Sequence, residues 1–279
     1  STGMAIGTAA LIIIMSVYNG FDDLIKQSMG NVEPDLMVVP SEGKVFTPDS
    51  VSMARIRSLV SGGSVCEVLQ DNVFIDYDGV QNIAKAKGVD TVFERTTPIR
   101  ENMYSGEFSL HKGDLPQMVA GAGLAYKLGM NPAFLSSAAI YYPVRDRKIS
   151  MSNPAASLNC IKMRPSGLFS VKQQTDDELV IVPLDKMREL LGYGEEISAL
   201  EIRIPQGCPE KEFKGIQKEM KEVLGKDFKV LDRYHQNTAL YKMMEYEKAA
   251  TYLILIFIII IIALNIFSSL TMLIIEKKE

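Results

Sequence analysis

AATYLILIFIIIIIALNIFSSLTMLII, residues 249–275, is an uninterrupted run without a charged side chain. At about 1.5 Å per residue, a helix of this length reaches roughly 40 Å, which is enough to cross a bilayer with some tilt. Neither glycine nor proline occurs from Arg233 to Glu279, and the polar tail EKKE follows the apolar run directly. The run therefore predicts a transmembrane helix. The helical spacing of Leu240, Met243 and Met244 upstream predicts that this helix continues out of the membrane as a stalk.

A second uncharged segment, residues 1–21, lies at the other end of the chain. We expect it to be most of another membrane helix, which continues as a stalk to about Gly30. Gly3 and Gly7 have the GxxxG spacing that lets a neighbouring helix approach closely, so they are candidate helix-packing residues. Two membrane helices predict one extramembrane body between them. Lys277 and Lys278 after the second helix favour a cytoplasmic end there, which places residues of about 22–248 outside the cytoplasm.

Composition excludes several classes of function. The formal net charge of −4 provides no basic face for nucleic acid, so we expect no nucleic-acid partner. The three cysteines lack the CxxC spacing of a zinc site, and neither of the two histidines lies near a cysteine or acidic cluster, so no metal site is expected and the thiols are interpreted as buried or inert. The segment GAGLAYKLGM, residues 121–130, has Tyr126 where the dinucleotide-binding fingerprint needs its third glycine, so no cofactor is predicted.

The sequence predicts an α+β fold for the extramembrane body. Strand, helix and strands are followed by a mostly β segment, and then by strand, helix and strand, which predicts a split βαβ sheet with an inserted second lobe. Asp78-Gly79 between two strand-like runs predicts a hairpin with a type I′ turn. The expected divisions are a truncated first membrane helix with its stalk (1–30), the first half of the sheet lobe (31–115), the inserted β lobe (116–194), the second half of the sheet lobe (195–232), and the second stalk and membrane helix (233–279).

A long connection, RDRKISMSNPAASLN (residues 145–159), joins two predicted strands of the inserted lobe. Connections of this length in compact domains are usually functional or mobile. Ile149, Met151 and Pro154 place apolar side chains among polar ones, which suits contact with a partner. Composition alone is equally compatible with an unstructured tip.

Five segments together resemble the lipoprotein-releasing permeases LolC and LolE of Gram-negative bacteria and, more broadly, the MacB and FtsX superfamily of ABC permeases. They are GTAALIIIMSVYNGFDDLI (7–25), VEPDLMVV (32–39), GAGLAYKLGM (121–130), SGLFSV with ELVIVPLDKMRELL (166–191) and the closing residues 247–279. The resemblance covers essentially the whole chain in the same order. It implies four membrane helices, of which this chain holds most of the first and the second, and a periplasmic domain with a porter-like and a sabre-like lobe.

The resemblance also implies a set of partners in the cell inner membrane. These are a cytoplasmic ABC ATPase, a second permease subunit in a homo- or heterodimer, lipoprotein cargo, and a periplasmic lipoprotein carrier that a loop of the sabre-like lobe binds. The loop with Ile149, Met151 and Pro154 occupies the matching place. The chain itself is then no enzyme, because a separate ATPase powers transport.

The alternative function is a mechanotransmitter of the MacB or FtsX kind, which drives efflux or activates a cell-wall hydrolase. An enzyme or sensor is the weakest hypothesis, because no nucleophile, base and orienting group cluster in the sequence.

Overall fold

The structure is a computed structural model that describes residues 9, 12–13, 15–16, 20, 33–145, 157–205, 207–236 and 238–276. The chain divides into two units, residues 31–233 and residues 1–30 with 234–279.

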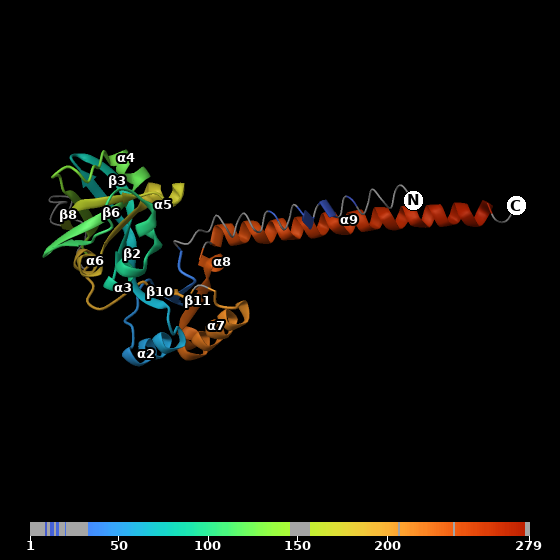
Figure 1. Cartoon of the computed structure of the whole chain (residues 1–279), viewed down its shortest axis with the longest axis horizontal. Helices are drawn as coiled ribbons and strands as arrows, with labels where there is room; N and C mark the ends of the chain where they lie inside the picture. Colours follow the sequence, from blue (N-terminus) through green and yellow to red (C-terminus); the bar gives the residue numbers. More distant parts are fainter. Residues whose placement is uncertain are drawn as a thin grey trace. The chain divides into compact units, whose positions relative to one another are not determined.

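A four-stranded antiparallel sheet lies at one end of the first unit, in the order β11-β1-β10-β2 (Figure 1). β10 lies between β1 and β2, so this sheet contains a split βαβ motif whose strands come from both ends of the body. This arrangement confirms the α+β prediction. The elements are β1 (Leu36–Pro40), α2 (Ser50–Leu59), β2 (Ser64–Tyr77), β10 (Ala199–Arg203), α7 (Glu210–Leu224) and β11 (Phe228–Asp232).

Helices α2 and α7 pack against each other and against this sheet, and Figure 1 shows them side by side although they are far apart in the sequence. Their shared core contains Leu36, Ile56 and Ile202, all fully buried. Thr47-Pro48 in the sequence predicts a helix that starts at Pro48. The helix begins at Ser50 because the Asp49 side chain accepts a hydrogen bond from Ser52 N, which makes Asp49 the N-cap.

The rest of the first unit contains six strands that pair in a closed ring, β2-β3-β9-β6-β8-β7 and back to β2. One edge of β2 pairs with β10 at residues 64–68 and with β7 at residues 74–76, so β2 belongs to both the four-stranded sheet and the barrel. Inward-facing side chains from all six strands form one buried core. The additional strands are β3 (Val80–Val89), β6 (Leu115–Gly121), β7 (Ala138–Pro143), β8 (Leu158–Phe169) and β9 (Leu179–Pro183).

Two predicted local features of the barrel are confirmed. Asp78 and Gly79 have φ values of 50° and 84°, the positive values that a type I′ turn requires. The sequence also predicts a brief helix over residues 185–191 that ends at Gly192, and α6 (Leu184–Leu191) ends there, with Gly192 in the left-handed conformation. Helix α6 packs on β2, β3, β7, β8 and β9. A Cβ added to Gly88 of β3 would lie 2.3 Å from the Met187 Cβ of this helix, so the close contact needs glycine.

One prediction was wrong. The sequence predicts two short strands, residues 160–164 and 167–171, but the structure has one continuous strand, β8. Its register against β6 shifts between Met118↔Pro165 and Val119↔Gly167, so the irregularity at the proline is absorbed within one strand. The predicted lobe boundaries stay a prediction, although β2 and β3 precede residue 116 and supply two of the six barrel strands.

Shorter elements cover the outer wall of the barrel. A further buried cluster joins Phe93, Ile99 and Phe108 to Val119 and Ile181 of the wall. The elements on this wall are α3 (Thr91–Thr96), the 3-10 helix η1 (Pro98–Asn102) and β4 (Met103–Gly106). Elsewhere, β5 (His111–Lys112) pairs with β6, and α4 (Ala122–Leu128), which contributes to the barrel core, packs on α5 (Gln173–Glu178). The 3-10 helix η3 (Gly225–Asp227) follows α7 in the lobe of the four-stranded sheet.

The second unit contains α9 (Thr238–Glu276), a helix of 39 residues that follows the short α8 (Arg233–Gln236). Residues Glu245–Ser268 of α9 are long and apolar enough to cross a membrane, by length and composition. This span agrees with the prediction for residues 249–275. Most of the predicted first membrane helix, with Gly3 and Gly7, lies outside the described residues.

Candidate functional site

The candidate site is the end of the β7–β8 hairpin, from which the long connection leaves. Pro143 pairs with Leu158, and Val144 N donates a hydrogen bond of 2.9 Å to Ser157 O. The predicted partner-binding residues Ile149, Met151 and Pro154 all lie outside the described residues. The structure therefore describes only the two strand ends that hold the connection, residues 143–145 and 157–159, which we call the loop base.

Three contacts hold this base in place. The Arg145 guanidinium lies 4.2 Å from the centre of the Tyr193 ring, just beyond α6. Asn159 Nδ2 donates a hydrogen bond of 2.9 Å to Leu190 O at the end of α6. On the neighbouring strand, the Tyr142 hydroxyl donates a bond of 2.9 Å to the Asp71 carboxylate. The loop thus starts and ends on a support that is bonded to both α6 and β2.

Burial, reinforced by the hydrogen bond to Asp71, raises the pKa of Tyr142 to about 12. The phenol therefore remains a neutral donor throughout the physiological range. Its bond to Asp71 positions β7 against β2 and does not provide an acid or base at neutral pH.

An exposed apolar row crosses the outer face of the barrel beside this base. Ile83, Phe74, Tyr141 and Cys160 are successive cross-strand partners on β3, β2, β7 and β8. Ile83 and Phe74 are 68% and 40% exposed, and the Phe74 and Tyr141 rings lie 6.3 Å apart. The sequence predicts buried or inert thiols; Cys66 is buried, whereas Cys160 is exposed. Apolar side chains gathered on an open face are typical of an interaction surface.

The polar side chains next to the row form its rim. Asp76 and Gln81 form a cross-strand pair of β2 and β3 beside the row, and Gln81 Nε2 donates a hydrogen bond of 2.8 Å to the Asp76 carboxylate. On the other side, Asn72 is paired with Lys85, and both are exposed. An apolar centre with a polar rim is the usual anatomy of a protein interface. Sequence reasoning missed this row, because the apolar run from Val73 to Ile75 does not show which residue faces out.

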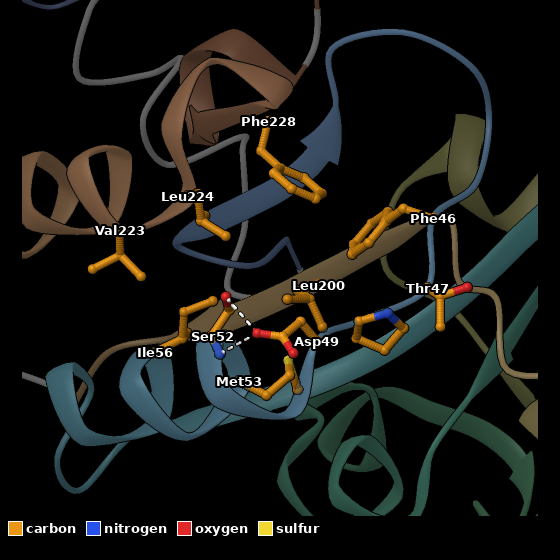
Figure 2. Close-up of a pocket in the computed structure, with 11 residues that line it drawn as sticks. Phe46, Thr47, Asp49, Ser52, Met53, Ile56, Leu200, Val223, Leu224 and Phe228 are labelled. Atoms are coloured by element: carbon orange, nitrogen blue, oxygen red, sulfur yellow. Dashed lines mark hydrogen bonds between the residues drawn. The ribbon is translucent and has the colours of Figure 1, made fainter.

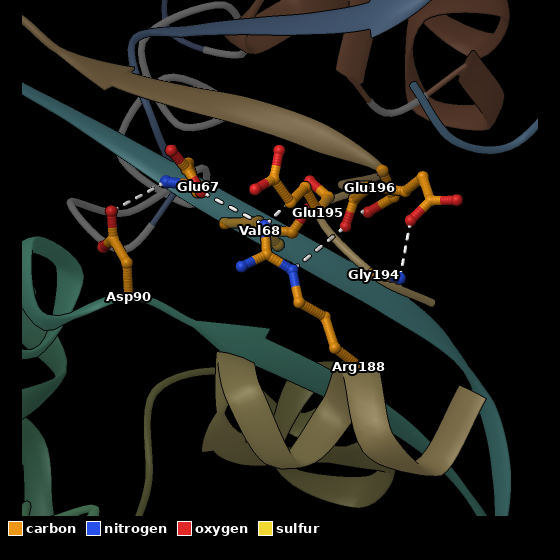
Figure 3. A network of polar contacts seen from close by, with 8 residues as sticks. Glu67, Val68, Asp90, Arg188, Gly194, Glu195 and Glu196 are labelled. Carbon is orange, nitrogen blue, oxygen red and sulfur yellow. Dashed lines mark hydrogen bonds and ion pairs between the residues drawn. The ribbon is translucent and has the colours of Figure 1, made fainter. Parts of the chain in front are cut away.

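Arg188 of α6 fixes the junction between the barrel and the four-stranded sheet (Figure 3). Its guanidinium donates hydrogen bonds of 2.9 Å to Glu195 O, 3.3 Å to Glu196 O and 3.3 Å to the Glu67 carboxylate of β2. One side chain therefore joins a barrel helix, the connection toward β10 and the strand that both sheets share. Bonds to charged groups are stronger than those between neutral groups.

A pocket of about 90 Å³ opens between α2, α7 and β11 (Figure 2). Its lining is mainly apolar, with the rings of Phe46 and Phe228 5.0 Å apart. At its rim, hydrogen bonds from the backbone and hydroxyl of Ser52 lower the pKa of Asp49. That carboxylate is already used as the α2 cap, so the arrangement offers no general base. Among the residues that the structure describes, no group of three or more His, Cys, Asp or Glu side chains could hold a metal ion.

Comparisons with known proteins match the chain over most of its length. The model of the MacB-like periplasmic core domain family matches residues 1–214. Two curated proteins from Buchnera aphidicola and Neisseria meningitidis, both named lipoprotein-releasing system transmembrane protein LolC, are 23% and 22% identical to it over 284 and 298 residues. These alignments cover 99% of this chain and 66% and 65% of those proteins, so the chain spans about two thirds of their length. The resemblance predicted from the sequence motifs is confirmed.

Two solved structures are also similar to the chain. The periplasmic region of MacB from Actinobacillus actinomycetemcomitans has 12% identity and a TM-score of 0.48, with 78% of this chain and 95% of that chain covered. The extracellular domain of the ABC-type transporter YknZ from Gram-positive bacteria has 12% identity and a TM-score of 0.48, with 71% and 99% covered.

Proposed function

The chain belongs to the MacB-like periplasmic core domain family, and from this premise we propose that it is a permease subunit of an ABC transporter that releases lipoproteins from the inner membrane to a periplasmic carrier. One observation carries the proposal. In a chain that aligns over 99% of its length with two LolC proteins, the long loop leaves from an anchored hairpin end beside an exposed apolar row. A support bonded to α6 and β2 suits a loop that binds a partner, because a rigid base lowers the entropy lost on binding.

In this proposal the carrier binds the loop and the apolar row together. Ile149, Met151 and Pro154 contact it from the loop, and Phe74 and Ile83 contact it from the barrel wall. The row supplies apolar area that the loop alone lacks, and its polar rim fixes the orientation of the bound protein. This assigns the barrel to the sabre-like lobe and the four-stranded sheet to the porter-like lobe.

The membrane segments connect this body to the energy source. We place residues of about 22–248 in the periplasm and α9 across the inner membrane, with a first membrane helix that packs through Gly3 and Gly7. A cytoplasmic ABC ATPase and a second permease subunit complete the transporter, and the chain itself catalyses no reaction. At about 1.5 Å per residue, the 39 residues of α9 extend nearly 60 Å. Because α9 contains neither glycine nor proline, it is suited to transmit motion as a stiff rod.

The first experiment is photocrosslinking in cells from position 151 of the full-length protein, with adducts identified by untargeted mass spectrometry. We expect a soluble lipoprotein carrier as the main adduct. A photoreactive residue at Val51, which is 74% exposed on α2, is the matched control and should not yield that adduct. The double variant Met151→Asp with Pro154→Gly should abolish function while expression and membrane insertion stay normal. Full activity of this variant would refute the role of the loop.

The apolar row is tested separately with Phe74→Lys. Removing a central apolar contact from an interface commonly weakens binding about tenfold or more. We expect that loss in carrier crosslinking from position 151, whereas Val51→Lys, an equally polar change at another exposed apolar site, should have no effect. Unchanged crosslinking in Phe74→Lys would limit the interface to the loop.

The second candidate function is a MacB- or FtsX-type mechanotransmitter that drives efflux or activates a cell-wall hydrolase. The family match favours it as the alternative, because the family is described by its MacB-like domain. A hydrolase or an efflux adaptor crosslinked at position 151 would select this function.

A further inference from the structure

The two ends of the body leave the four-stranded sheet next to each other. Leu36, the first residue of β1, pairs with Asp232, the last residue of β11. Just outside this pair, Arg233 Nη2 lies 2.7 Å from Asp35 Oδ1, and Asp35 Oδ2 accepts a hydrogen bond of 2.8 Å from Ile204 N. Both oxygens of the Asp35 carboxylate are therefore bonded where the two chain ends leave the sheet. The Asp35 and Arg233 side chains are only 21% and 32% exposed.

An ion pair connects the barrel to the chain segment just before β1. Lys172 Nζ lies 3.0 Å from Glu33 Oε1, and the two residues are 139 positions apart in the sequence. Lys172 is the N-cap residue of α5, where the buried Asp176 carboxylate accepts hydrogen bonds from Val171 N and from the Ser170 hydroxyl. The backbone that carries Lys172 is thus fixed to the barrel, while Glu33 belongs to the chain just before β1.

Other contacts hold the barrel to the sheet more firmly. β2 runs through both, and Arg188 joins α6 to β2 and to the connection before β10. Lys87 of β3 and Glu201 of β10 form an ion pair whose side chains are 12% and 4% exposed. Helix α6 packs directly on β2, whereas α5, which follows Lys172, packs on α4, β3 and β6. A tilt of the barrel about β2 therefore changes the Glu33–Lys172 distance at the side of α5.

The contacts differ in how easily they break. The Glu33 and Lys172 side chains are 34% and 35% exposed and share one ion-pair contact, so the attraction is screened by solvent and small in net effect. The Lys87–Glu201 pair is buried, and separating it would leave uncompensated charge inside the protein. Of these contacts, Glu33–Lys172 is the one that can open and close at little cost.

We propose that the Glu33–Lys172 ion pair is a releasable latch that couples the tilt of the barrel to the chain segment entering β1. With the latch closed, the barrel follows that segment. With it open, the barrel tilts about β2 while Asp35 and Arg233 keep the two chain ends together. The latch extends the proposed function, and its link to transport rests on that function, but its opening can be measured without cargo or carrier.

The test measures distances by double electron-electron resonance in the full-length transporter complex in lipid nanodiscs. Spin labels replace Val51 on α2 and Leu115 on β6, which are 74% and 68% exposed, and the accessible Cys160 and Cys208 are changed to serine. We expect Glu33→Lys or Lys172→Glu to raise the ratio of a second distance population to the parent population by up to about fivefold, the effect of losing one exposed ion pair. The exchanged pair, Glu33→Lys with Lys172→Glu, should restore the parent distribution.

The matched control is Lys127→Glu. Lys127 forms an ion pair of similar exposure with Asp177, at 3.3 Å, but both residues belong to the barrel lobe. This variant should leave the distance distribution unchanged. Parent-like distributions in both single variants would overturn the latch, and so would an equal change in the Lys127 control or an exchanged pair that remains altered. If the latch passes this test but carrier crosslinking fails, only the proposed function is refuted.

Discussion

Replacing Asp176 by alanine tests how the barrel holds α5 and the Lys172 backbone in place. The Asp176 side chain is 7% exposed, and its carboxylate accepts hydrogen bonds of 2.9 Å from Val171 N and 3.0 Å from the Ser170 hydroxyl. A weaker contact of 3.4 Å comes from Lys172 N. The alanine variant leaves these donors without an acceptor in a place that water reaches poorly.

The expected loss follows from the two short bonds. A buried donor left unsatisfied costs about 1–3 kcal/mol, and the backbone donor of Val171 cannot turn toward another acceptor. The Ser170 hydroxyl can rotate, so its share is at the low end of that range. We therefore expect Asp176→Ala to lower the free energy of unfolding by about 3 kcal/mol. For a body of this size, that corresponds to a fall of roughly 6–12 °C in the unfolding midpoint.

The assay is thermal unfolding of the full-length protein, followed by near-ultraviolet circular dichroism, which reports the packing of the tyrosine-rich body. The neighbouring Asp177→Ala is the matched control. Asp177 is more exposed and has an ion pair with Lys127, so its loss should cost less than about 1 kcal/mol. Equal midpoints for the two variants would refute the argument that the buried carboxylate organises this turn.

Two further predictions concern buried polar groups. Among the described residues, the Tyr77 hydroxyl is buried in the barrel and has no hydrogen-bond partner, so Tyr77→Phe should raise the free energy of unfolding by about 1 kcal/mol. Tyr142→Phe removes the hydrogen bond to Asp71 and should lower the free energy of unfolding. Destabilisation by both, measured in urea, would contradict this. Burial raises the pKa of Cys66 to about 11 from 9.0, so iodoacetamide at pH 8 should modify the exposed Cys160 and spare Cys66. Because the unfolded thiol ionises first, the stability due to Cys66 is complete below pH 9 and falls as pH rises toward 11; a Cys66→Ala variant should lack that fall.

Local patterns predicted the local structure well. The apolar spacing of Phe213, Ile216 and Met220 predicts an amphipathic helix over residues 209–224, and α7 begins one residue later, at Glu210. Asp78-Gly79 identified a hairpin because few residue pairs tolerate two positive φ values in succession. These features depend on neighbours in the sequence, so they can be read from it directly.

Boundaries and short elements were predicted less well. The α2 start depended on the competition between Pro48 and the Asp49 cap, and only the hydrogen bond to Ser52 decided it. The helices α3 and α5 were not predicted, since each has six residues and too little periodicity to recognise.

The candidate site was only partly accessible to sequence reasoning. The length of the connection after β7 predicted a loop that is either functional or an unstructured tip, and it gave no sign of the row of Ile83, Phe74, Tyr141 and Cys160, which is built from four strands. These residues become neighbours only through strand register, which a run of alternating side chains does not encode. The same holds for the contact between Glu33 and Lys172, which the chain brings together across 139 positions.

The sequence by itself determined that α9 is long and apolar enough to cross a membrane, and it predicted the split βαβ order and the type I′ hairpin, because each follows from length, periodicity or backbone sterics within a short segment. Tertiary structure decided that β2 is shared between the sheet and the barrel, and that the ring closes between β2 and β7. Closure depends on which distant strands share one buried core and in which register, and many pairings bury similar apolar area. Only the packed structure selects among those pairings, and it thereby places the loop base, the apolar row and the latch.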